Sequence, residues 1–304
     1  MAQTLDLLIH RTETMRSIRG IVRTMKTMSA INALPYEQAA RTIETYRDTV
    51  LCGFQAFMHC NGPLPVAAET DAVPVLIAFG SHHGLCGSYN ESLAEMVAQS
   101  TTDRQATRVI CIGAQMEDAL TGLGIHPITT LLPPATAEGL GRLAGALITH
   151  IDAIRAPATT GAITVSLVLM QRGARGQQSP ALQRLLPLDP AMLGDLAGRP
   201  WDSRSLPQFH LPTNQLLAAL IRSYLFAELF RAGAEALLTE NAARLTRMQQ
   251  AEQSVDDRLE ELLADTRSVR QSEITTELLD VIVGFEALKS RDKPRLPHKP
   301  SDKR

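Results

Sequence analysis

The chain has 304 residues, a formal net charge of −2, 44% hydrophobic residues and only 4% aromatic residues. This length suits one or two domains, and the near-neutral charge gives no reason to expect a nucleic acid partner. The apolar runs are too short to cross a bilayer and the N-terminus lacks an apolar signal region, so we expect a soluble or peripheral protein. No cysteine pair forms CxxC, which fits a reducing compartment better than a disulfide framework.

The N-terminal segment, residues 3–58, is predicted to be a helix. Its apolar and small side chains recur at steps of three and four, as on one face of a helix. These positions are Leu5, Leu8, Thr12, Met15, Ile18, Val22 and Met25. Pro35 interrupts the pattern, and it is expected to kink the helix because it lacks a backbone donor.

The middle of the chain alternates short apolar strands with helical segments, which is typical of an α/β unit with a mainly parallel sheet. The expected strands are 73–79, 108–113, 126–132 and 162–170, and the expected helices are 90–100, 114–124 and 137–154. Residues 187–212 are rich in Pro, Gly and Asp, so they are interpreted as an ordered connector.

After the first strand comes GSHHGLCGSY, residues 80–89, which has several interpretations. The sequence support for a phosphate-binding loop is weak, because Gly80, Gly84 and Gly87 follow the spacing GxxxGxxG rather than GxGxxG. The sequence also contains no Walker motif. The second strand also ends without the acidic residue of a dinucleotide site.

The sequence support for a metal ion or a catalytic nucleophile in the same stretch is also weak. His82, His83 and Cys86 lack a second ligand cluster, and Cys86 has no identifiable base. The favoured interpretation is a structural turn, with glycines allowing a tight entry into the next helix and Ser88 or Asn90 near its cap.

A second helix is predicted over 211–288, where no proline occurs between Pro212 and Pro294. At 1.5 Å per residue it would reach roughly 110 Å, so part of it must project from a compact domain. Its seam has coiled-coil spacing. The seam positions are Leu245, Met248, Glu252, Val255, Leu259, Leu262, Thr266 and Val269.

The nearest partner for this seam is the N-terminal helix, paired antiparallel, although an ordinary long core helix is the alternative. The charged residues of the second helix are interpreted as a solvated face. The expected division is a helix at 1–60, an α/β lobe at 70–210, the second helix at 211–288 and a disordered basic tail at 289–304.

Residues 239–288 closely resemble the gamma subunit of F-type ATP synthases. The matching positions are Arg244, Met248, Arg270, Gln271, Ile274, Thr275, Glu277, Asp280 and Gly284. MRSIRGIVRTMKTMSAI resembles that family's first helix, with Met25 at its usual methionine, and the loop matches S-x-x-G-L-C-G. The segment LQRLLPL also matches a segment that precedes the long C-terminal helix in that family. His82-His83 stand where the family commonly has Asp-Arg; Ser88, Phe285, Pro35 and the basic tail also depart from its pattern.

The resemblance implies a long antiparallel two-helix coiled coil formed by both chain ends, with a central Rossmann-like lobe. It further implies the central rotor shaft, with catalysis on the beta subunits and no cofactor or metal of its own. The implied partners are the alpha and beta subunits, the epsilon subunit and the ring of c subunits, at the cytoplasmic face of a bacterial membrane. The residues leave open whether the ion is H⁺ or Na⁺.

From the same resemblance, coupling or partner contacts are expected at Met25, Arg244, Gln271, Thr275 and Glu277. The residues of the loop themselves predict a structural turn at Gly84, Cys86 and Gly87. The main alternative is a soluble α/β nucleotide-binding enzyme with a helical dimerisation arm. A coiled-coil scaffold unrelated to energy conversion is a third hypothesis.

Overall fold

The computed structural model describes the backbone of residues 2–64, 72–101, 103, 106–156, 162–173, 177–205 and 207–291. Side chains are described within these ranges for residues 4–286. The chain divides into two compact units, one made of Met1–Thr24 with Gln250–Arg304 and the other of Met25–Gln249. Most of the predicted basic tail, beyond Arg291, lies outside the described residues.

Two long helices dominate the structure: α1, Ala2–Asn61, and α6, Thr213–Arg291. α1 continues as a helix through Pro35, which lies inside it and does not end it. α6 begins directly after Pro212, whose carbonyl accepts from the Leu216 amide at 3.0 Å. A proline at this place suits a helix start, because the first amides of a helix have no partner within it.

The two helices pair antiparallel within each unit, as predicted. In the first unit Arg19 pairs with Asp256 at 2.6 Å and Arg23 with Glu252 at 2.7 Å, so four residues forward in α1 correspond to four residues back in α6. In the second unit Phe54 packs edge-on against Tyr224, with ring centroids 6.2 Å apart.

The predicted seam of α6 is turned away from solvent. All eight of its positions are buried or half-buried, with Met248, Leu259 and Leu262 the most enclosed. On α1 the predicted positions are likewise covered except Ile18, which is exposed. The periodicity therefore identified the contact face of both helices.

The second unit contains one five-stranded sheet with the order β3-β2-β1-β4-β5. Its strands are β1 Val73–Phe79, β2 Arg108–Ile112, β3 Thr129–Leu131, β4 Ile163–Arg172 and β5 Gln178–Leu186. β1 to β4 run parallel, which confirms the predicted mainly parallel sheet, and β5 pairs antiparallel with β4.

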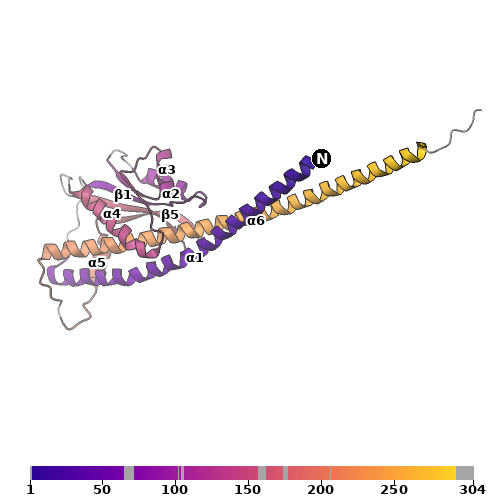
Figure 1. The fold of residues 1–304 in the computed structure, drawn as a ribbon. Helices are drawn as coiled ribbons and strands as arrows, with labels where there is room; N and C mark the ends of the chain where they lie inside the picture. Colours follow the sequence, from indigo (N-terminus) through magenta and orange to yellow (C-terminus); the bar gives the residue numbers. More distant parts are fainter. Residues whose placement is uncertain are drawn as a thin grey trace, which may run out of the picture. The chain divides into compact units, whose positions relative to one another are not determined.

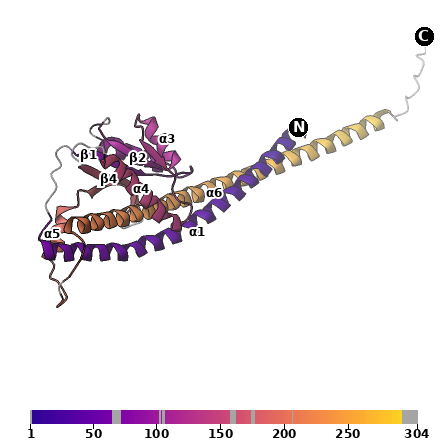
Figure 2. The same ribbon diagram turned by 60° about the vertical axis from the view of Figure 1, so that its left-hand side comes forward.

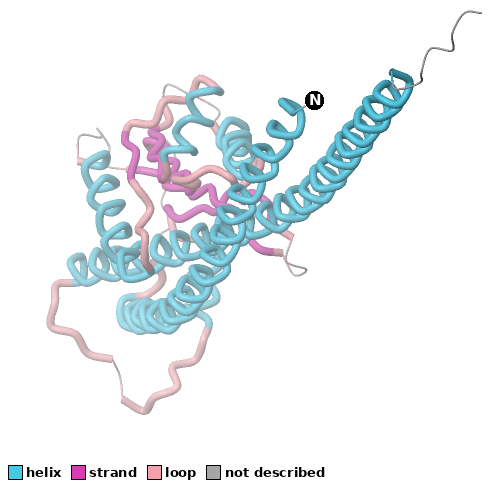
Figure 3. The backbone as a smooth tube through the Cα atoms, turned by 45° about the vertical axis from the view of Figure 1, so that its right-hand side comes forward, coloured by secondary structure: helices cyan, strands magenta, loops and turns pink. Residues whose placement is uncertain are grey.

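Helices cover both faces of the sheet (Figures 1 and 3). Along β1, Val75, Ile77 and Phe79 join the core formed with α1, α4, α5 and α6, whereas Leu76 and Ala78 join the core under α2 and α3. The bounds of these helices are α2 Tyr89–Ser100, α3 Ala114–Gly122, α4 Leu140–Arg155 and α5 Pro190–Gly198.

Residues of α1 and α6 share this core with one face of the sheet. Within this unit, α6 lies between the strands and α1, as Figure 2 shows. Across the described residues, no helix is both long and apolar enough to span a membrane.

Candidate functional site: the loop 80–88 against helix α6

The loop of residues 80–88 joins the end of β1 to the start of α2. Asn90 holds its beginning: the Asn90 Oδ1 accepts from the Ser81 amide at 2.9 Å, and its Nδ2 donates to the Ser81 Oγ at 2.8 Å. Ser88 stands at the N-cap of α2 without a capping hydrogen bond from its side chain. Asn90 therefore closes the loop rather than capping the helix.

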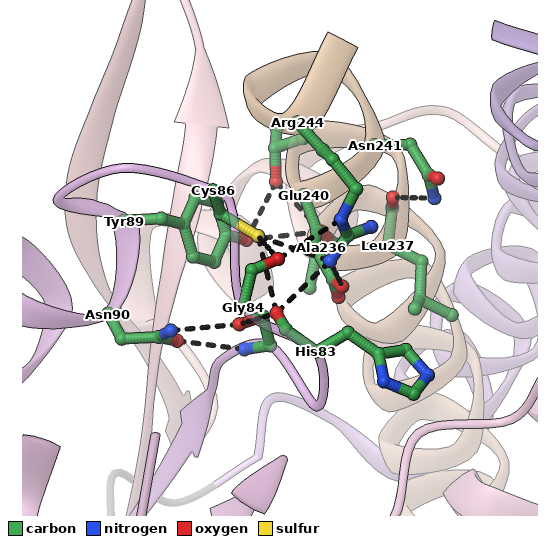
Figure 4. Close-up of polar contacts among 12 residues, drawn as sticks. His83, Gly84, Cys86, Tyr89, Asn90, Ala236, Leu237, Glu240, Asn241 and Arg244 are labelled. Atoms are coloured by element: carbon green, nitrogen blue, oxygen red, sulfur yellow. Dashed lines mark hydrogen bonds and ion pairs between the residues drawn. The ribbon is translucent and has the colours of Figure 1, made fainter. Parts of the chain in front are cut away.

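Arg244 of α6 reaches into this loop (Figure 4). Its guanidinium donates to the His83 carbonyl at 3.1 Å, to the Gly84 carbonyl at 3.3 Å and to the Cys86 Sγ at 3.1 Å. The loop therefore directs backbone oxygens and a sulfur toward a cation. Residues about 160 positions apart in the chain form this contact.

A buried ion pair supports the arginine. The Glu240 carboxylate lies one turn earlier on α6 and accepts from Arg244 at 2.5 Å. Both side chains are almost fully enclosed. Burial raises the pKa of the Glu240 carboxyl, and the Arg244 guanidinium opposes that rise.

Tyr89 makes a second contact between the loop end and α6. Its hydroxyl donates to the Ala236 carbonyl at 3.1 Å and lies 3.0 Å from the Thr239 hydroxyl. Burial raises the pKa of the Tyr89 phenol, so it stays a neutral donor. Two polar anchors, Arg244 and Tyr89, thus attach the loop to successive turns of α6.

The backbone of the loop needs glycine at one of the two expected positions. Gly87 has a φ of +68°, and a Cβ there would lie 2.3 Å from the Arg247 Nε. Gly84 has no positive φ, and its nearest neighbour would be 3.9 Å away, so the structure gives no steric reason for glycine there. Leu85 also has a positive φ, 67°, and this residue is 58% exposed.

The site does not have the chemistry of a phosphate loop. Phosphate loops direct backbone N–H groups at an anion, whereas here carbonyls point at a guanidinium. Burial raises the pKa of the Cys86 thiol, which disfavours the reactive thiolate. Within the described ranges, no group of three or more His, Cys, Asp or Glu side chains is placed to hold a metal ion.

The histidine pair lies at the outer side of the loop. The rings of His82 and His83 have centroids 4.6 Å apart. Burial, the neighbouring His82 and the Arg244 guanidinium all lower the pKa of His83. A lowered pKa favours the uncharged imidazole. The contact of His83 with α6 is made by its backbone carbonyl, which accepts from Arg244.

The structure separates the expected coupling residues into two places. Arg244 joins Gly84 and Cys86 in the second unit, and Met25 is half-buried on α1. Gln271, Thr275 and Glu277 are exposed on the part of α6 that belongs to the first unit.

The sequence did not predict the observed roles of three residues of the site, which are Glu240, Tyr89 and Asn90. The spacing of Glu240 and Arg244, four residues apart on one helix, could have predicted their ion pair. Tyr89 and the closing role of Asn90 carry no such signal, because their partners are distant or lie across a turn.

The fold defines a class of protein: two long helices paired antiparallel and packed on a mainly parallel sheet. A family model described as "ATP synthase" matches residues 4–288, and the chain belongs to this family. Curated relatives named ATP synthase gamma chain include those of Lachnoclostridium phytofermentans, 24% identical over 91% of this chain and 97% of that protein, and Syntrophus aciditrophicus, 26% identical over 90% and 96%.

Solved structures share the fold. A chain of the Euglena gracilis mitochondrial ATP synthase, in a structure of its OSCP, F1 and c-ring, gives a TM-score of 0.66 at 17% identity, covering 99% of this chain and 100% of that one. A chain from the Tetrahymena thermophila central stalk and c-ring gives 0.52 at 17% identity, covering 76% and 99%. The family assignment made from the sequence is confirmed, and the gamma-chain role is supported over the nucleotide-binding enzyme.

Proposed function

We propose that this chain is the central-stalk rotor subunit of an F-type ATP synthase and has no active site of its own. In this role it couples ion flow through the membrane sector to ATP synthesis or hydrolysis on the beta subunits by rotating. The carrying observation is the antiparallel pairing of α1 with the 79-residue α6, because such a helix pair is stiff enough to transmit torque.

The proposed partners are a ring of alpha and beta subunits around the helix pair, and the epsilon subunit and c-ring at the α/β lobe. The proposed location is the cytoplasmic face of a bacterial membrane, held there by the membrane sector. Met25, Arg244, Gln271, Thr275 and Glu277 are proposed as the residues through which the shaft and the ring are coupled. The exposure of Gln271, Thr275 and Glu277 supports contact with a partner.

The experiment is reconstitution with the alpha and beta subunits of the same organism. The chain should co-purify with them, and a bead attached to the lobe should rotate when ATP is added. The isolated chain should show no ATP hydrolysis. Hydrolysis that follows this chain through purification and is lost on its mutation, or a ring that hydrolyses ATP without turning the bead, would overturn the proposal.

A further inference from the structure

A second buried carboxylate on α6 connects three elements of the 25–249 unit. The Glu228 side chain is 1% exposed. It accepts from the Arg47 Nε of α1, from the Arg231 Nη2 of α6 at 2.8 Å and from the Gln183 Nε2 of β5 at 3.1 Å. Arg231 also donates to the Gln183 Oε1 at 3.0 Å. We call Arg47, Gln183, Glu228 and Arg231 the Glu228 cluster.

Charge balance keeps this cluster ionised. Burial favours a raised pKa for Glu228, but the guanidinium groups of Arg231 and Arg47 outweigh burial and hold its pKa below the ordinary value. The carboxylate therefore accepts charge-assisted hydrogen bonds from two arginines, which are stronger and more directional than neutral ones.

The surrounding contacts between α1 and α6 are of a different kind. Phe54, Tyr224 and Leu225 belong to the apolar core beside the sheet. Apolar contact in such a close-packed core resists sliding through shape, but the attraction itself is non-directional. Hydrogen bonds weaken steeply with distance and angle. The Glu228 cluster adds charge-assisted hydrogen bonds at the point where α1, α6 and β5 meet.

We propose that Glu228 is a positioning residue for rotary coupling: it fixes the register of α1, α6 and β5, so that torque passes between the helix pair and the lobe without slip. This inference rests on the proposed rotor function. It concerns how the subunit transmits rotation, and it predicts a loss of coupling that is separable from a loss of stability.

The test replaces the three charged members of the cluster by apolar groups of similar size, Arg47→Met with Glu228→Leu and Arg231→Met, and keeps Gln183. Replacing a whole buried ion-pair group in this way is often neutral or stabilising, so the thermal melting temperature should stay near that of the unmodified chain. In the reconstituted complex, ATP hydrolysis should persist, while the number of ions pumped per ATP should fall at least twofold. Bead fluctuations should also report a torsionally softer rotor.

A matched control uses the bidentate pair of Arg172 on β4 and Glu235 on α6, which has no member on α1. Arg172→Met with Glu235→Leu should leave ions per ATP unchanged. Arg47→Met alone is the second variant, because it releases only α1 and leaves Glu228 paired with Arg231. It should lower the same ratio even if the triple variant fails to fold.

An unchanged ratio in either folded cluster variant would overturn the inference, as would an equal fall in the control. Failure of the underlying function is distinguishable, because the unmodified chain would then support neither rotation nor ATP-driven pumping.

Discussion

The pKa values of two buried carboxylates on α6 are shifted in opposite directions, and the two carboxylates have different numbers of arginine partners. Glu228 has two guanidinium partners, which overcome the cost of burial and lower its pKa. Glu240 has one, Arg244, and burial prevails, so its pKa is raised. The balance between burial and neighbouring guanidinium groups therefore shifts the pKa of the same side chain on the same helix in opposite directions. These residues give two testable consequences.

The first concerns Arg244. Arg244→Met should lower the free energy of unfolding by about 3–5 kcal/mol, because it leaves the buried Glu240 charge and the loop carbonyls unpaired. Adding Glu240→Leu should restore much of this loss. Arg41→Met, which removes an exposed pair with Glu37 on α1, should cost no more than about 1 kcal/mol. Urea unfolding of the purified chain measures all three, and equal losses for Arg41 and Arg244 would contradict the burial argument.

The second concerns pH and Glu228. Because its pKa is lowered in the folded chain, its ionisation stabilises the fold above the unfolded value of about 4.3, and this contribution is lost as the pH falls through the folded pKa. Unfolding free energies measured from pH 6 downward should therefore fall more steeply for the unmodified chain than for Glu228→Gln. The opposite contribution of Glu240 is common to both chains and cancels in their difference. Parallel curves would show that Glu228 is not held ionised.

At the scale of elements, sequence periodicity predicted the helices and strands that have a local apolar pattern. It missed a strand that lacks such a pattern and a contact between residues far apart in the sequence. The steps of three and four identified the facing sides of α1 and α6, and apolar runs identified β1 to β4. β5 was missed because its sequence, QSPALQRLL, mixes Pro and polar residues along a largely uncovered edge. The contact of the loop with Arg244 was missed because no local pattern links residues about 160 apart.

The loop itself allows a matched comparison of its glycines. Gly87→Ala should cost about 1–2 kcal/mol, because a side chain at positive φ is strained and its Cβ would displace Arg247. Gly84→Ala should be nearly neutral, since the space around it is open and its φ is not positive. Thermal melts of the two variants test this difference, and a larger loss for Gly84 would mean that the loop backbone differs from the one described.

At the scale of the whole molecule, the unit formed by the chain ends exposes a long apolar surface. Between Val269 and Glu286, where the side chains of α6 are described, seven large apolar side chains are exposed: Ile274, Leu278, Leu279, Val281, Ile282, Val283 and Phe285. Monomeric proteins rarely expose a contiguous apolar patch of this kind, and such patches mark interaction surfaces. The sequence argument that the apolar seam of a projecting helix needs a partner therefore extends past the part of α6 that faces α1.

This surface predicts how the purified chain behaves without its partners. Because exposed apolar area is removed from water on association, the isolated chain should self-associate as its concentration rises in sedimentation velocity experiments. Leu278→Ser, Ile282→Ser and Phe285→Ser, spaced along one face, should together reduce that association. A control with serine at the exposed polar positions Gln271, Glu277 and Asp280 introduces the same number of serines and should leave association unchanged. A chain that stays monomeric at every concentration, or an equal effect of both serine sets, would show that the apolar end of α6 does not drive association.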